Sequence, residues 1–310
     1  MKKLGLALGG GGLRGLAHIG ILQVLEDNNI PPNIVAGTSV GSIIAALYAS
    51  GMSAYQMEQE VVKLKPHDYL DYNFSGFIKH LLACFFPAIN NNIDGIIKGE
   101  RLEKIVCHLT GGRDLRDSKV PLAIIACDID SGREIVFASE KIPLQGNDIL
   151  LIEDARLSQA VRSSTAIPAV FVPYRHKYCN VVKREKFAIP AVFVPYRLQG
   201  MQLVDGGVRS MVPVTVQRLL GAEYILAINL GQEVYDQAVE GIPQIVNRTI
   251  SILAYETSAT EQKVYANMVI HPQVGEVKLH DLHRAPEIIR IGRRVMKERI
   301  DELKKALLAQ

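Results

Sequence analysis

The sequence predicts a single α/β domain built on a mainly parallel β-sheet. Short apolar runs alternate along the chain with segments of helical length and periodicity. Several of these runs are apolar at nearly every position, which is typical of strands that are covered on both faces. No Pro-, Gly- or Ser-rich linker divides the 310 residues. We therefore expect one domain over 1–310.

Composition narrows the function classes and predicts a metal-free, reduced protein in the cytoplasm. Net charge is only +3, Trp is absent and aromatic residues make up 6%, which argues against a nucleic-acid partner. The apolar start of the chain breaks too early for a signal peptide, and no run reaches the length of a membrane span. Any membrane contact is therefore expected to be peripheral. The four cysteines are far apart and form no metal-binding motif such as CxxC, and we expect no cofactor; they are Cys84, Cys107, Cys127 and Cys179.

A glycine-rich turn follows the first expected strand. An apolar run over 4–8 leads into it, and a helix over 16–28 follows. Gly10, Gly12 and Gly15 fit the dinucleotide fingerprint G-x-G-x-x-G, which requires an acidic residue at the end of the second strand. That strand ends in a serine motif instead, so the dinucleotide interpretation fails its own test.

The same turn has a second interpretation, as an oxyanion hole. Such a hole needs N–H donors that no side chain obstructs, and the amides of Gly10, Gly11 and Gly12 meet this need. His18 lies three residues into the next helix. We interpret it as a helix residue at the edge of the sheet and not as a catalytic base.

The serine motif carries more functional information than any other stretch. A short strand over 34–36 runs into Gly37-Thr38-Ser39-Val40-Gly41, and a helix closed by Gly51 follows. In a G-x-S-x-G turn the serine hydroxyl is exposed at a strained corner, and Gly37 and Gly41 permit the close backbone approach. The helix N-terminus favours negative charge there, although a serine at this place is often only an N-cap. Because the strands are parallel neighbours, both turns should lie at one edge of the sheet, with Ser39 as candidate nucleophile.

The middle of the chain is expected to be largely helical up to about residue 110. Its most apolar and aromatic segment, 77–89, is either a lid or membrane-facing helix or an ordinary buried helix. The other elements expected here are a helix from 99, a buried strand over 120–128, its hairpin neighbour over 134–139 and a helix over 157–164.

A decapeptide is then repeated letter for letter. Residues 166–175 read AIPAVFVPYR, and residues 188–197 read the same. An identity of this length indicates a tandem duplication with a basic spacer and not a solenoid repeat. One copy is expected to occupy its place in the fold, and the other to bulge out beside it.

The next strand, over 202–205, ends in Asp205-Gly206-Gly207. An Asp-Gly pair usually marks only a turn, but this one follows an apolar strand and precedes a helix, which places the carboxylate at a strand end. The rest of the chain is expected to hold a strand over 224–229 and a C-terminal part over 243–310: a helix over 243–268, a strand over 268–272 and a helix over 286–310 with a solvated charged face.

Taken in order, these motifs closely resemble those of the patatin-like phospholipase family, above all the compact bacterial members related to the catalytic domain of neuropathy target esterase. The resemblance covers about residues 4–230 and includes the stretch SSTAIP at 163–168. It implies a three-layer α/β/α fold and lipid acyl hydrolase activity through a Ser-Asp dyad. It also implies these roles: Ser39 as nucleophile, Asp205 as base, Gly10, Gly11, Gly12 and Arg14 as oxyanion loop, and Gly15, Gly37, Gly41, Gly206 and Gly207 as supporting residues.

Two alternatives stay open beside the dyad. A Ser-Asp-His triad could use His271, His280 or His283, all of which follow Asp205 in the chain. The chain also departs from the family's spacing by the duplicated insertion, 176–197, just before Asp205. A non-catalytic or regulatory lipid-binding protein, with its site occluded by this insertion, is therefore the second hypothesis. The sequence leaves the particular lipid and the oligomeric state open.

Overall fold

The computed structural model describes residues 1–72, 97–143, 146, 148–167, 195–231, 235, 238–239 and 241–309. The segment 77–89 lies outside these ranges, as does the duplication except for its two ends. The first copy is described at Ala166 and Ile167, and the second copy at Pro195, Tyr196 and Arg197. No helix in these ranges is both long enough and apolar enough to span a membrane.

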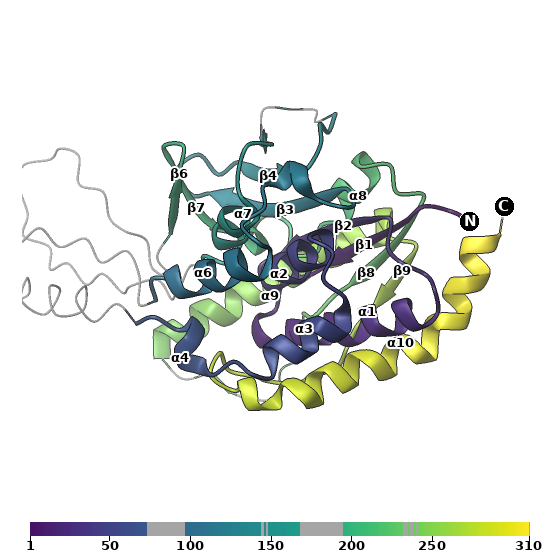
Figure 1. Cartoon of the computed structure of the whole chain (residues 1–310). Helices are drawn as coiled ribbons and strands as arrows, with labels where there is room; N and C mark the ends of the chain where they lie inside the picture. Colours follow the sequence, from purple (N-terminus) through teal and green to yellow (C-terminus); the bar gives the residue numbers. More distant parts are fainter. Residues whose placement is uncertain are drawn as a thin grey trace, which may run out of the picture.

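A mixed, mainly parallel sheet forms the centre of the molecule, as the sequence predicts (Figure 1). In the described part of the chain its strands follow the order β5-β4-β3-β2-β1-β8-β9, and β7 pairs with β3 and β6. Their bounds are β1 Leu4–Leu8, β2 Ile34–Thr38, β3 Leu122–Asp128, β4 Glu134–Ala138, β5 Ile149–Ile152, β6 Tyr196–Leu198, β7 Met201–Asp205, β8 Tyr224–Ile228 and β9 Met268–Ile270.

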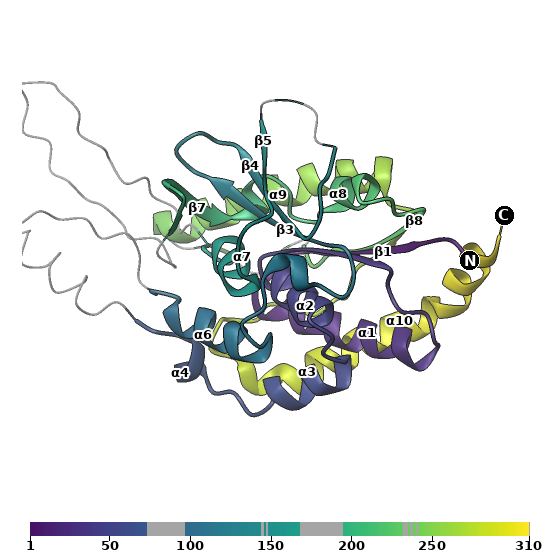
Figure 2. The ribbon, with the colours of Figure 1, turned by 45° about the horizontal axis from the view of Figure 1, so that its top comes forward.

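Helices cover both faces of the sheet, which gives the expected three layers. Side chains alternate across each strand, so Leu4, Leu6 and Leu8 of β1 pack into one core and Ala7 packs into the other. Figure 2 shows α8 Val214–Leu219 and α9 Gly241–Tyr265 on one side of the sheet. On the other side lie α1 Ala17–Asp27, α2 Val40–Ala49, α3 Ala54–Val61 and α10 Ala285–Leu308. The remaining helices are α4 Pro66–Tyr69, α6 Glu100–Leu109, α7 Leu157–Ser164 and the short 3-10 helices Gly12–Leu16, Leu115–Asp117, Gly206–Val208 and Leu282–Arg284.

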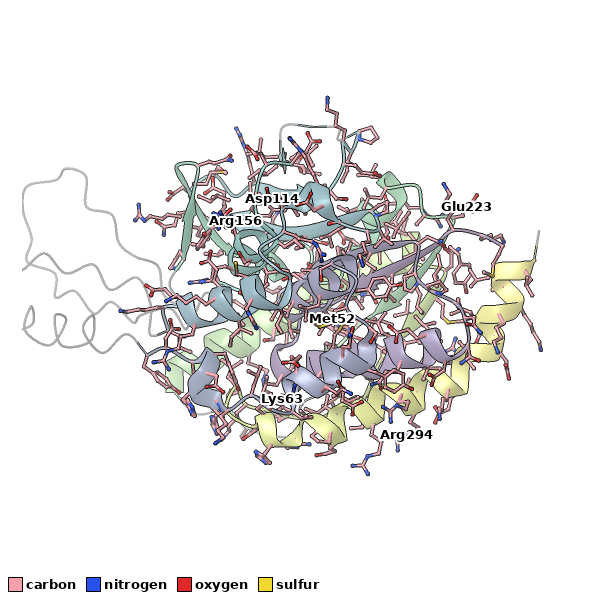
Figure 3. All side chains as sticks on the ribbon, in the orientation of Figure 1. Met52, Lys63, Asp114, Arg156, Glu223 and Arg294 are labelled. Atoms are coloured by element: carbon pink, nitrogen blue, oxygen red, sulfur yellow. The ribbon has the colours of Figure 1, made fainter. Side chains whose placement is uncertain are left out.

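The expected elements that fall within the described ranges are found, with small changes at their ends. The predicted hairpin is present, because β4 pairs antiparallel with β3. Two short strands, β5 and β6, were not predicted from the sequence. Outside the named strands, the backbones of Asp114 and Arg156 pair antiparallel over a single residue pair. Figure 3 shows these two residues close together on the surface.

One edge of β3 brings two distant strand ends together. Its first half pairs in parallel with β2, where Ile125 lies opposite Thr38. Its last residues pair antiparallel with β7, where Ala126 lies opposite Asp205. Since β4 occupies the other edge of β3, β2 and β7 share one edge and point toward each other. Thr38 and Asp205 therefore lie opposite neighbouring residues of a single strand.

Candidate active site

Ser39 occupies a strained corner between β2 and α2. Its φ of 54° and ψ of −128° are rare for a residue with a side chain. The chain passes so closely here that a Cβ on Gly37 would lie 2.3 Å from the Gly41 carbonyl oxygen. A Cβ on Gly41 would lie 2.1 Å from the carbonyl oxygen of Leu8 in β1. The two glycines of the motif are therefore required by backbone packing.

Asp205 lies at the end of β7 and meets Ser39. Its Oδ1 accepts a hydrogen bond of 2.8 Å from the Gly207 N–H, and its carboxyl group is also hydrogen-bonded by the Ser39 side chain. Burial raises the pKa of Asp205 to about 6, against the lowering effect of these two hydrogen bonds. Gly206 makes the turn possible, because a Cβ there would lie 2.3 Å from the Ile125 carbonyl oxygen. The two candidate residues are thus adjacent, and the carboxyl group is poised to titrate near neutral pH.

The end of α7 and the residues that follow it hydrogen-bond both Ser39 and Asp205. Ser164 Oγ accepts a hydrogen bond of 2.9 Å from the Ser39 N–H. The Ala166 carbonyl oxygen accepts one of 2.8 Å from the Asp205 N–H. Sequence reasoning gave these residues no role, although both belong to the SSTAIP stretch that carries part of the family resemblance.

The glycine-rich loop lies against Ser39, but its amides are not equivalent. A Cβ on Gly10 would lie 3.1 Å from Ser39 Cβ, which places the loop beside the candidate nucleophile. The Gly10 N–H donates a hydrogen bond of 3.0 Å to the Met211 carbonyl oxygen, so it is not free to bind a substrate oxygen. Within the described ranges the N–H groups of Gly11 and Gly12 have no hydrogen-bond acceptor. Of the three expected oxyanion donors, two are therefore available.

Arg14 and His18 fix the direction of this loop. Arg14 Nε donates a hydrogen bond of 3.1 Å to the Gly11 carbonyl oxygen. In a trans peptide the N–H points opposite to the C=O, so the Gly12 N–H points away from Arg14. His18 lies in α1, as predicted, and its Nε2 donates 2.9 Å to the Gly9 carbonyl oxygen. Burial lowers the pKa of His18 to about 4, so it is neutral at pH 7. Both side chains act on the loop, and neither is free to act as a base on Ser39.

Gly15 packs the glycine-rich loop against α2. A Cβ at Gly15 would lie 2.1 Å from Cγ1 of Val40, the residue that follows Ser39. The first turn after the loop therefore packs directly against the start of α2.

The exposed histidines do not complete a triad here. The Asp205 carboxyl group meets Ser39 and Gly207, whereas the side chains of His271, His280 and His283 are solvent-exposed. Among the described residues no group of three or more His, Cys, Asp or Glu side chains could hold a metal ion.

An apolar groove opens at Ser39 and runs between α3 and α6, with α2 as its floor. It encloses a cavity of about 140 Å³. Four residues of one face of α2 line it, namely Val40, Ile43, Ile44 and Leu47, at the i, i+3, i+4 and i+7 spacing of a helix face. Glu60 is the one charged residue among the described lining residues. The site therefore combines a polar corner with an apolar channel.

Comparisons with known proteins point to one family. A family model described as patatin-like phospholipase matches residues 6–183. The chain is 24% identical over 230 residues to patatin-like phospholipase domain-containing protein 6 of Mus musculus, covering 74% of this chain and 14% of that protein. It is 22% identical to an uncharacterized NTE family protein of Mycobacterium tuberculosis, covering 83% of this chain and 57% of that protein. Among solved structures, VipD from Legionella pneumophila matches with a TM-score of 0.45 and 15% identity, over 97% of this chain and 67% of that one.

Proposed function

The chain belongs to the patatin-like phospholipase family, and from this premise we propose that it is a lipid acyl hydrolase with Ser39 as nucleophile and Asp205 as general base. The observation that carries the proposal is the buried Asp205 carboxyl group hydrogen-bonded by Ser39 at the mouth of an apolar groove. An ordinary aspartate, with a pKa of 3.8, is a weak base near neutral pH. The raised pKa of Asp205 brings it closer to the range that general bases need.

The proposed reaction has two steps. Ser39 Oγ attacks the ester carbonyl carbon while its proton moves to Asp205, and the Gly11 and Gly12 N–H groups stabilise the oxyanion. The bond to the alcohol then breaks, and the alcohol leaves with the proton from Asp205. In the second step water attacks the acyl group on Ser39 and gives a proton to Asp205. The carboxylic acid leaves, and the proton returns to Ser39 Oγ.

A fluorophosphonate probe tests the proposal directly. We expect one covalent adduct on the wild-type chain by intact mass and none on Ser39→Ala. Ser50→Ala is the matched control, because Ser50 is a buried serine at the other end of α2 whose Oγ donates 2.7 Å to the Leu47 carbonyl oxygen. It should be labelled like the wild type. A folded wild-type protein without an adduct would contradict the proposal and favour a lipid-binding protein with an occluded site.

Ser164 is expected to act as a positioning residue. Ser164→Ala leaves the buried Ser39 N–H without its acceptor, at a cost of about 1–3 kcal/mol, and we expect kcat to fall roughly 10- to 100-fold with KM little changed. Ser164→Thr, which keeps the hydroxyl group, should restore much of the rate.

Ser163→Ala is the matched control for this prediction. Ser163 is equally buried, but its Oγ donates 2.8 Å to the Gln159 carbonyl oxygen within its own helix. Its loss should lower stability without a comparable fall in kcat. Equal falls in kcat for the two alanine variants would show that α7 as a whole, and not the bond to Ser39, is needed.

A further inference from the structure

The groove beside Ser39 has a direction and a length. Its floor follows α2 from Ser39 to Leu47, and residues of α3 and α6 line its sides. Figure 1 shows these three helices next to one another. Eight residues of α-helix at 1.5 Å per residue make this floor about 12 Å long. Leu47 and Met57, which line the far end, are only 5% and 2% exposed. The groove therefore has a buried inner end.

The walls of the groove fit one occupant, an alkyl chain. The apolar face of α6 points into it through Leu102, Ile105 and Leu109, which remain partly exposed. On the opposite wall the Tyr69 hydroxyl donates to the Leu279 carbonyl oxygen and joins α4 to the segment before α10. An acyl chain carried on Ser39 Oγ would enter at the polar end and bury its methylene groups between these walls.

We propose that this groove selects esters of medium-chain acids, with about eight to ten carbons, and that Ile43 and Leu47 set the limit. The inference rests on the proposed function of Ser39. An extended alkyl chain of C–C bonds close to 1.5 Å advances roughly 1.3 Å per carbon, so about nine carbons span the 12 Å floor. Ile43 lies halfway along it, and Leu47 lies at its end.

The wild-type protein provides the first test, with p-nitrophenyl esters of four to sixteen carbons. While the chain extends within the groove, each methylene group should raise kcat/KM roughly three- to fourfold. We expect this increase to stop at about ten carbons. An increase that continues to sixteen carbons would contradict the proposed limit.

Two variants then move the limit in opposite directions. Ile43→Phe narrows the groove near its middle, and we expect at least a 30-fold loss of kcat/KM for octanoyl esters with less than a threefold change for butyryl esters. Leu47→Ala opens the inner end and should shift the optimum to longer chains. Met52→Phe is the size-matched control, because Met52 is half-buried just beyond α2 and does not line the groove. Equal losses at every chain length in Ile43→Phe would overturn the assignment.

Binding without catalysis separates this inference from the proposed function. Titration calorimetry of Ser39→Ala with free fatty acids of four to twelve carbons should show affinity rising up to about ten carbons, and Ile43→Phe in the same background should remove the gain. If the acids bind in this way but the wild-type chain cleaves no ester, the groove is confirmed as an alkyl-chain site and the hydrolase proposal fails. If esters are cleaved with no dependence on chain length, the groove assignment alone fails.

Discussion

Asp205→Asn is expected to lower kcat as severely as Ser39→Ala, by about 10⁶-fold in each case. In a Ser-His-Asp triad the aspartate only orients the histidine, and its loss costs less than the loss of serine or histidine. Here Asp205 meets Ser39 directly, so asparagine removes the proposed base itself. The double variant should be no slower than either single variant, because in the proposed mechanism the two residues act as a unit. Ester turnover by the three variants, measured with saturating substrate, checks this.

A matched control for this prediction lies on the neighbouring strand. Asp128 ends β3, is 7% exposed and accepts hydrogen bonds from the Ser131 hydroxyl and the Gln202 N–H, without contact to Ser39. Asp128→Asn should keep kcat within a few-fold of the wild type. A much milder effect of Asp205→Asn, together with a 10⁶-fold loss on replacing His271, His280 or His283, would establish a triad instead.

Asparagine at position 205 should not destabilise the fold. Burial disfavours the ionised carboxylate, which is why the pKa of Asp205 is raised. Asparagine removes this buried charge at neutral pH and keeps the size of the side chain. We therefore expect the Tm of the variant at pH 8 to equal or exceed that of the wild type, so that its loss of activity is not a loss of structure.

Much of the fold could be predicted because its strong signals are local. The apolar run over 120–128 predicts a buried strand, and the strand-turn-helix pattern around Ser39 predicts the corner that the structure contains. The division of the β3 edge between β2 and β7 could not be predicted, because register between distant segments leaves no periodicity in either. Strands β5 and β6 are short and lie away from the sheet centre, so their patterns are too brief to separate from loops.

The candidate site was predictable where a motif requires a special backbone. Ser39, Gly37 and Gly41 belong to one local turn, and Asp205 follows a recognisable strand. The use of the Gly10 N–H by Met211 could not be foreseen, since the two residues meet only through the packing of the loops that follow β1 and β7. Ser164 lies 125 positions from Ser39. In the sequence, a serine whose hydroxyl group accepts a hydrogen bond from a distant amide looks like any other serine in a helix.

The rate of ester hydrolysis should fall tenfold for each pH unit below about 6. Asp205 must be ionised to accept the Ser39 proton, and burial raises its pKa from the usual 3.8 to about 6. A profile of kcat/KM from pH 4 to 9 should therefore be level above pH 7 and bend at about pH 6. A bend near pH 4 would show that the base is an ordinary exposed carboxylate.

Glu134, half-buried at the start of β4, titrates in the same pH range and must be controlled for. Burial, with the neighbouring Glu261, raises the pKa of Glu134 to about 7, so Glu134→Gln should leave the bend at about pH 6 if Asp205 is the base. A bend that moves with this substitution would assign it to Glu134.

Stability must be followed over the same pH range, because Asp205 and His18 act on it in opposite directions. The folded chain holds the Asp205 proton more tightly than the unfolded chain, so acidification through pH 6 toward 4 stabilises the fold at this residue. His18, with its pKa lowered to about 4, is protonated first in the unfolded chain and destabilises the fold as the pH falls below about 6.5. Because the two effects oppose each other, we expect the protein to remain folded at pH 5 by circular dichroism while its kcat/KM is already about tenfold reduced. Loss of structure in parallel with loss of rate would instead make His18 the cause.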